Sequence, residues 1–70
     1  MPRRLSSREI ETVLLDAGFV LSRRKGSHCI YTRLGYSGHV TVVAGEKVVP
    51  MGTLASIIRQ SGLSRKDFGI

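Results

Sequence analysis

The N-terminal part of the chain shows the apolar spacing of an amphipathic helix. In the segment LSSREIETVLLDAGF, apolar residues recur three and four positions apart, which places them on one side of a helix. Ser6 and Glu9 have the spacing of a capping box, in which each side chain accepts a hydrogen bond from the other residue's backbone N–H. Gly18 suits the position just after a helix end, because glycine adopts positive φ without strain. The pattern predicts a helix from about Ser7 to Ala17.

After this helix the pattern changes to that of β-strands. Three segments are rich in β-branched and aromatic residues, and short glycine-containing loops separate them. Loops this short join antiparallel neighbours, because a parallel connection needs a dozen or more residues. The sequence therefore predicts a three-stranded antiparallel meander. Its strands are FVLSRR (19–24), HCIYTRL (28–34) and HVTVV (39–43).

A second helix is predicted after the loop AGEKVVP. Pro50 suits its first turn, where a missing N–H costs nothing, and Gly62 suits its end. Ser64 and Asp67 repeat the capping spacing, so a final short turn, SRKDF, is expected. The apolar stripe of this helix consists of Leu54, Ile57 and Ile58, with Met51 as a further candidate.

These elements define one domain over residues 1–70, an α+β fold in the order α-β-β-β-α. Two helices with one apolar stripe each can cover only one face of a three-stranded sheet, so a two-layer domain is expected. The other face is left open to solvent or to a partner. Side chains alternate along the second strand, with His28, Ile30 and Thr32 on one face and Cys29, Tyr31 and Arg33 on the other. The sequence leaves open which of these sets faces outward.

The chain is strongly basic, which bears on its partners. Its net charge is +6 over 70 residues, and eight of the eleven basic residues are arginine. Arginine offers planar paired donors that suit phosphate, so a nucleic acid is the favoured partner and an acidic protein surface the second. No apolar run approaches the roughly 20 residues of a membrane span, and no signal-peptide pattern is present. A single cysteine fits a reducing compartment, so we expect a cytoplasmic protein that does not bind membranes.

The segment RRKGSHCIYTR carries the candidate chemistry. His28 can exchange a proton near neutral pH, which suits hydrolysis of phosphodiesters. The cations before it can hold phosphate and stabilise charge that develops on it, and backbone N–H groups beside a glycine can approach an anion closely. The same residue types are also typical of a plain hairpin corner, and from the residues alone both interpretations stay open. The candidate phosphate-binding residues are Arg23, Arg24, Lys25, Gly26, Ser27 and Lys47.

The expected strand register bears on the neighbours of His28. If Leu34 pairs with His39, then His28 lies opposite Gly45, and His39 is roughly 17–20 Å away along the ladder, too far to share a proton. Lys47 is then the nearer helper. No metal site is expected, because Cys29 directly follows His28 and so faces the other side, and no metal-ligand or nucleotide-binding spacing occurs.

The segments DAGFVLSRRKGSHCIYTR, VTV and GTLASIIRQSGL together resemble the HicA family of bacterial toxins, over about residues 6–63. The most specific part is Gly26-Ser27-His28-x-x-Tyr31, followed later by a Gly52-Thr53-Leu54-x-x-Ile57 helix. The resemblance implies a fold similar to the double-stranded RNA-binding domain. It also implies a toxin that cleaves messenger RNA, with the motif histidine, here His28, as the catalytic residue. The implied partner is a HicB antitoxin that covers the active site.

The chain departs from the family pattern in one place. Family members often carry a proline and a histidine just after the third strand, where this chain has Val43-Ala44-Gly45. We therefore expect His28 to work without a second histidine. Because RNA carries its own nucleophile, the 2′-OH, we expect an endoribonuclease that needs no metal and no cofactor. A non-catalytic RNA-binding module and a domain that binds an acidic protein are the alternatives.

Overall fold

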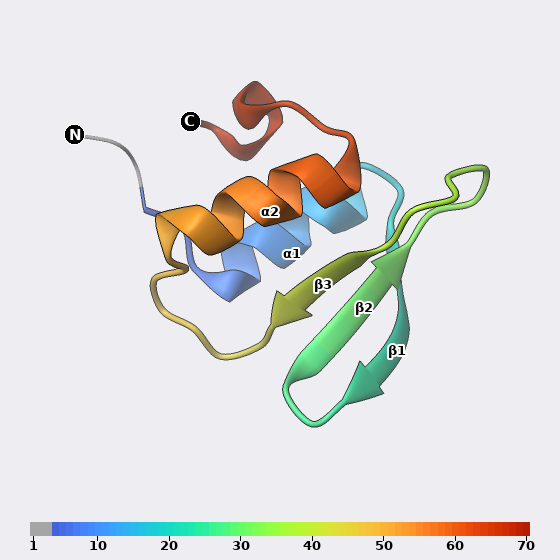
Figure 1. Cartoon of the computed structure of the whole chain (residues 1–70), viewed down its shortest axis with the longest axis horizontal. Helices are drawn as coiled ribbons and strands as arrows, with labels where there is room; N and C mark the ends of the chain where they lie inside the picture. The colour runs from blue at the N-terminus through green and yellow to red at the C-terminus, as the bar shows by residue number, and fades with distance from the viewer. Residues whose placement is uncertain (1–3) are drawn as a thin grey trace.

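The structure, a computed structural model, describes residues 4–70 and has the expected order of elements (Figure 1). The sheet has the order β1-β2-β3 with antiparallel neighbours, and both helices lie on one side of it. The prediction of a two-layer α+β domain is therefore confirmed. The elements are α1 (Ser7–Asp16), β1 (Val20–Lys25), β2 (His28–Thr32), β3 (Val40–Val43), α2 (Met51–Ser61) and a short 3₁₀ helix, η1 (Arg65–Phe68).

The ends of the helices follow local sequence signals. At α1, the Glu9 N–H donates to Ser6 Oγ at 3.2 Å and the Ser6 N–H donates to Glu9 Oε1 at 3.0 Å, so the predicted capping box is present. Ser64 and Asp67 form the same arrangement at η1. Pro50 is the N-cap of α2 and so precedes the first turn, in which it was expected. Gly62 ends α2 with a φ of +71°, a backbone conformation that favours glycine.

The hydrophobic core lies between the helices and one face of the sheet. Alternate residues of β2 and β3 are buried there, which leaves His28, Ile30 and Thr32 on the open face. The question that the sequence left undecided is thus answered. The core residues from the sheet are Cys29, Tyr31, Val40 and Val42, and those from the helices and loops are Leu5, Ile10, Leu14, Phe19, Val49, Leu54, Ile57 and Phe68.

The β2–β3 register differs from the expected one. His28 pairs with Val43 and Tyr31 with Val40, so the prediction that His28 lies opposite Gly45 was wrong by two residues. The reason is that the connection between β2 and β3 leaves the ladder early to pack on the helices. Tyr36 donates its hydroxyl hydrogen to the Gln60 carbonyl of α2 at 2.6 Å. The strands consequently end sooner than the sequence pattern suggested.

A cation–π cluster holds the same connection against the end of α1. The Arg33 guanidinium lies 4.8 Å from the centre of the Phe19 ring and 5.3 Å from that of the Tyr36 ring. Its Nη1 also donates to the Ala17 carbonyl at 3.1 Å. Together with the hydrogen bond from Tyr36 to α2, these contacts attach the loop to both helices, which fixes where β3 starts.

Ser7 ties the other end of β3 to the first turn of α1. This side chain is buried, its hydroxyl donates to the Val43 carbonyl, and it accepts from the Glu46 N–H at 3.1 Å. The Ser7 N–H donates in turn to the Glu46 carbonyl at 2.9 Å. The end of β3 that lies beside His28 is therefore fixed by α1.

Replacing Ser7 by Ala tests this attachment. We expect a loss of about 1–3 kcal/mol in the free energy of unfolding, because two partly buried backbone groups lose their partner. Urea denaturation followed by circular dichroism measures it. The matched control is Ser56→Ala on α2, where a change below about 0.5 kcal/mol is expected. Equal losses in the two variants would contradict the structural role of Ser7.

Candidate nucleic-acid interface

A two-residue turn, Gly26-Ser27, joins β1 to β2 directly before His28. Lys25 pairs with His28 across this turn. Gly26 has a φ of +60°, whereas no described residue other than glycine has positive φ. This combination is that of a type II′ turn, which favours glycine at its first position. The turn thereby fixes the register that sets Lys25 beside His28, and both turn residues are exposed.

The open face of the sheet carries His28 at the centre of a row of three side chains. Lys25 on β1 and Val43 on β3 pair with His28 from either side. Residues directly opposite one another in an antiparallel pair share a face, with Cβ atoms about 4.5–5.5 Å apart. Lys25 and His28 are exposed. A cation therefore lies next to the histidine, on the side that solvent can reach.

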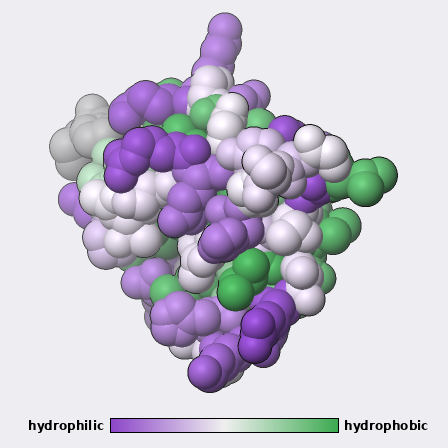
Figure 2. All heavy atoms as spheres, turned by 45° about the vertical axis from the view of Figure 1, so that its right-hand side comes forward, coloured by the Kyte–Doolittle hydropathy of each residue, from purple (hydrophilic) through white to green (hydrophobic). Residues whose placement is uncertain are grey.

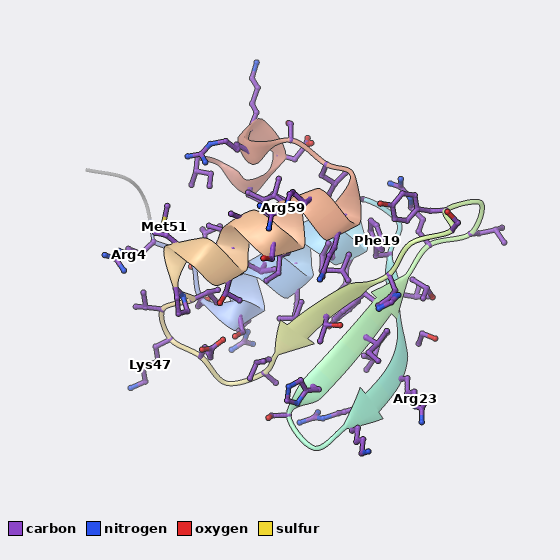
Figure 3. The ribbon with its side chains drawn as sticks, viewed as in Figure 1. Arg4, Phe19, Arg23, Lys47, Met51 and Arg59 are labelled. Carbon is purple, nitrogen blue, oxygen red and sulfur yellow. The ribbon has the colours of Figure 1, made fainter. Side chains whose placement is uncertain are left out.

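A second row follows along the same face. Arg23 on β1 and Thr41 on β3 pair with Ile30. Figure 3 shows Arg23 on the edge strand, where its side chain points away from the helices. In Figure 2, hydrophilic side chains gather at the lower end of the molecule, where the β1–β2 hairpin lies, and hydrophobic ones lie just above them. The open face is thus basic with an apolar strip.

Arg24 lies on the other face of the same strand. It pairs with Cys29, whose side chain is buried against the helices. The Arg24 Nε donates to the Gly26 carbonyl at 3.0 Å, which supports the turn from behind. Of the three consecutive cations, two share the face of His28 and one supports the hairpin.

An irregularity in β1 decides which cations face outward. The β1–β2 register shifts between Leu21 and Arg23, so Ser22 has no partner on β2. With uninterrupted pairing from Leu21, the neighbour of His28 would be Arg24. A bulge reverses the alternation that follows it, and bulges often re-aim side chains near functional sites. Here the bulge allows Arg23 and Lys25 to share the face of His28.

Lys47 lies apart from this group. It is exposed on the loop between β3 and α2, and Figure 3 shows it and Arg23 on opposite sides of the molecule. The shifted register explains this position, because Val43 takes the place beside His28 that Gly45 was expected to occupy. The structure therefore does not bring Lys47 together with the other candidate phosphate-binding residues.

The two histidines lie at opposite ends of the β2–β3 ladder, as expected. His28 forms a pair at one end, and His39 precedes Val40, which forms a pair at the other. The observed register separates them by four positions, about 13 Å, so the expected separation of roughly 17–20 Å was too large. Among residues 4–70, no three His, Cys, Asp or Glu side chains are grouped so that they could hold a metal ion.

Tyr31 belongs to the core. Burial, followed by the nearby Glu11 carboxylate and a hydrogen bond to it, raises the pKa of Tyr31 to about 12. The ring is 4% exposed and faces α1, so this tyrosine of the sequence motif is not accessible for base stacking. Its role is to attach β2 to the helical layer.

Sequence reasoning missed one neighbour of His28, Val43, and left open whether the face that His28 shares with Ile30 is the exposed one. Ile30 shares a face with His28 by alternation alone, so the available signal identified it once the open face was known. Val43 required the register, which depends on the contacts of Tyr36 with α2. In the part of the chain that the structure describes, no helix has the length and apolar character needed to cross a bilayer.

The fold and this face define a small, basic two-layer domain with a solvent-exposed histidine at a hairpin. Residues 7–63 match the family model described as HicA toxin of bacterial toxin–antitoxin. The match covers most of the chain, which therefore belongs to the HicA toxin family and is a toxin of a toxin–antitoxin system. The family is one of ribonuclease-type toxins. Comparison with curated proteins found no match.

The raised pKa of Tyr31 predicts a specific loss of stability at alkaline pH. The unfolded chain releases this proton near pH 10 and the folded chain near pH 12, so between these values the folded state holds a proton that the unfolded state has lost. Stability conferred by Tyr31 is present below pH 10 and decreases as the pH rises. Between pH 10 and 11 the loss is about 1 kcal/mol.

Urea denaturation at pH 9, 10 and 11 measures this dependence. In Tyr31→Phe, the free energy of unfolding is expected to decrease less with pH, because the contribution of Tyr31 is gone. Tyr36→Phe is expected to keep that contribution. Parallel pH profiles for the wild type and Tyr31→Phe would disprove the assignment.

Proposed function

We propose that this chain is an endoribonuclease that cleaves messenger RNA with His28 and is neutralised by a HicB-type antitoxin. The observation that carries the proposal is the row Lys25–His28–Val43 on the open, basic face of the sheet, in a chain of the HicA toxin family. A proton-exchanging group and a cation lie side by side there, and both are exposed.

The chemistry requires little beyond these groups. The ribose 2′-oxygen attacks the adjacent phosphorus, a new O–P bond forms, and the bond from phosphorus to the 5′-oxygen of the next nucleotide breaks. The 2′-OH loses a proton and the departing 5′-oxygen gains one, which leaves a 2′,3′-cyclic phosphate and a 5′-hydroxyl. His28 carries one of these protons, and water exchanges the other. Lys25 stabilises the negative charge that builds on the phosphate oxygens.

The nature of the nucleophile sets the substrate class. The 2′-OH is present in RNA and absent from DNA, so a deoxyribose at the cleaved position blocks the reaction. Because the nucleophile belongs to the substrate, the proposed reaction needs neither a metal ion nor a cofactor. Its target, messenger RNA, places the activity in the bacterial cytoplasm.

The antitoxin has a natural place to bind in this proposal. The open face combines exposed cations with partly exposed apolar side chains, and no helix formed by residues 4–70 covers it. A HicB-type protein that buries His28 and supplies carboxylates opposite Lys25 excludes RNA. The same charges serve both partners, so RNA and antitoxin compete for this face.

Incubation of a labelled RNA with EDTA tests the catalytic role of His28. We compare the wild type, His28→Ala and the control His39→Ala, each checked for folding by circular dichroism. Cleavage by the wild type and His39→Ala is expected, with a loss of at least about 100-fold in His28→Ala. The same RNA with deoxyribose at the cleaved position stays intact.

Two outcomes would contradict the proposal. Undiminished cleavage by folded His28→Ala would show that another group acts. Intact RNA with all three proteins, across a broad set of sequences, would favour the non-catalytic RNA-binding module instead.

Replacing Lys25 by Gln tests charge stabilisation next to His28. We expect cleavage to slow by about tenfold to a hundredfold for every RNA substrate, because the cation that faces the reacting phosphate is lost. Lys66→Gln on η1 removes the same charge far from the sheet and is the matched control. Single-turnover rates at saturating protein measure the chemical step. Equal rates in the two variants would remove Lys25 from the mechanism.

A further inference from the structure

Arg23 and Lys25, the two cations on the open face, differ from the nearby Arg24 and Arg33 in their hydrogen bonding. Arg24 and Arg33 donate to backbone carbonyls, as described above. Arg23 and Lys25, within the described residues 4–70, have no hydrogen bond or ion pair with another side chain or carbonyl. Both are exposed. Arg23 and Lys25 are thus available to an external anion, whereas the other two are engaged in the fold.

The spacing of the two free cations is defined by the strand. Arg23 and Lys25 are two residues apart in β1 and on the same face, so their side chains start about 6–7 Å from each other. This separation is close to that of successive phosphates in an extended RNA strand. Two phosphates of one strand therefore fit the two cations, provided that the strand runs along β1.

The second row supplies more than a charge. Ile30 lies between Arg23 and Thr41 and is partly exposed. An apolar side chain at this place gives the ribose or base between the two phosphates a surface to pack on. The bulge at Ser22 is what allows the two cations to share this face, so the arrangement depends on a specific local feature of β1.

We propose that Arg23 forms a second phosphate subsite, which binds the phosphate one nucleotide away from the cleaved bond. The inference rests on the proposed ribonuclease activity and extends it. Lys25 and His28 act on the phosphate that reacts, and Arg23 holds its neighbour and aligns the strand along β1. The site is thereby specific for a single, extended RNA strand with at least two consecutive phosphates.

Short substrates of defined phosphate number test the subsite. The dinucleotide that spans a mapped cleavage site has one phosphate, which must occupy the reacting position in order to be cleaved. The same dinucleotide is then prepared with an additional phosphate at its 5′ end or at its 3′ end. The ratio of kcat/KM with and without the additional phosphate measures the subsite directly.

For the wild type we expect one of the two terminal phosphates to raise kcat/KM by about tenfold, since a charge-assisted hydrogen bond is formed. In Arg23→Gln this ratio falls to about one, and in the control Arg65→Gln on η1 it remains at the wild-type value. Figure 1 shows η1 at the end of the molecule opposite to the hairpin. A ratio in Arg23→Gln equal to that of the wild type would overturn the subsite.

A binding experiment judges the subsite even where nothing is cleaved. In the His28→Ala background, the affinity for a single-stranded RNA oligonucleotide is measured at several salt concentrations. Adding Arg23→Gln reduces the slope of log affinity against log salt by about 0.7, the value for one phosphate contact to a single strand. Adding Arg65→Gln leaves the slope as it was. Identical slopes for all three proteins would overturn the proposal.

The outcomes separate the two proposals. Cleavage by the wild type together with an unchanged phosphate ratio in Arg23→Gln refutes the subsite alone. No cleavage of any RNA, combined with an Arg23-dependent salt slope, refutes the proposed activity and supports a phosphate-binding site on the open face.

Discussion

The packing of two helices on a single face of the sheet is the constraint on which the rest of the molecule depends. The described residues form two α-helices with an apolar stripe each, and both stripes are used to bury the side of the sheet that carries Cys29 and Tyr31. No helix in the described part of the chain covers the opposite side. As a consequence every second residue of β2, beginning with His28, lies on the open face, and β1 is exposed along its whole length.

The hydrogen bonds at the ends of the strands convert this exposed sheet into a defined site. Tyr36 and Arg33 attach one end of the β2–β3 hairpin to the helices, and Ser7 attaches the other end to α1. The His28 row lies at the second of these ends, where the Ala44 N–H also donates to the Ser27 carbonyl at 2.7 Å. The tight turn and the ladder fix the backbone position of His28. The strand register then decides which side chains lie beside it.

Much of this architecture was predictable because its signals are local. Capping at Ser6 and Ser64, the helical spacing of apolar residues, and short glycine loops indicated the elements and their antiparallel order. The register was not predictable, because it depends on the contact of Tyr36 with a carbonyl 24 residues further on. The bulge was not predictable either, because Ser22 carries no local signal that distinguishes it from a regular strand residue. The motif therefore pointed to His28, but the residues that share its face required the three-dimensional structure.

The bulge also decides which of the three consecutive cations share the face of His28. In a regular hairpin, alternation assigns neighbouring residues to opposite faces, and the bulge only chooses which residues face which way. The choice made here places one arginine behind the turn as a structural support and leaves Arg23 and Lys25 facing solvent beside His28. These like charges repel a second copy of the same edge strand and attract a polyanion. The edge of the sheet is thereby protected from self-association by the same residues that, in the proposed function, hold RNA.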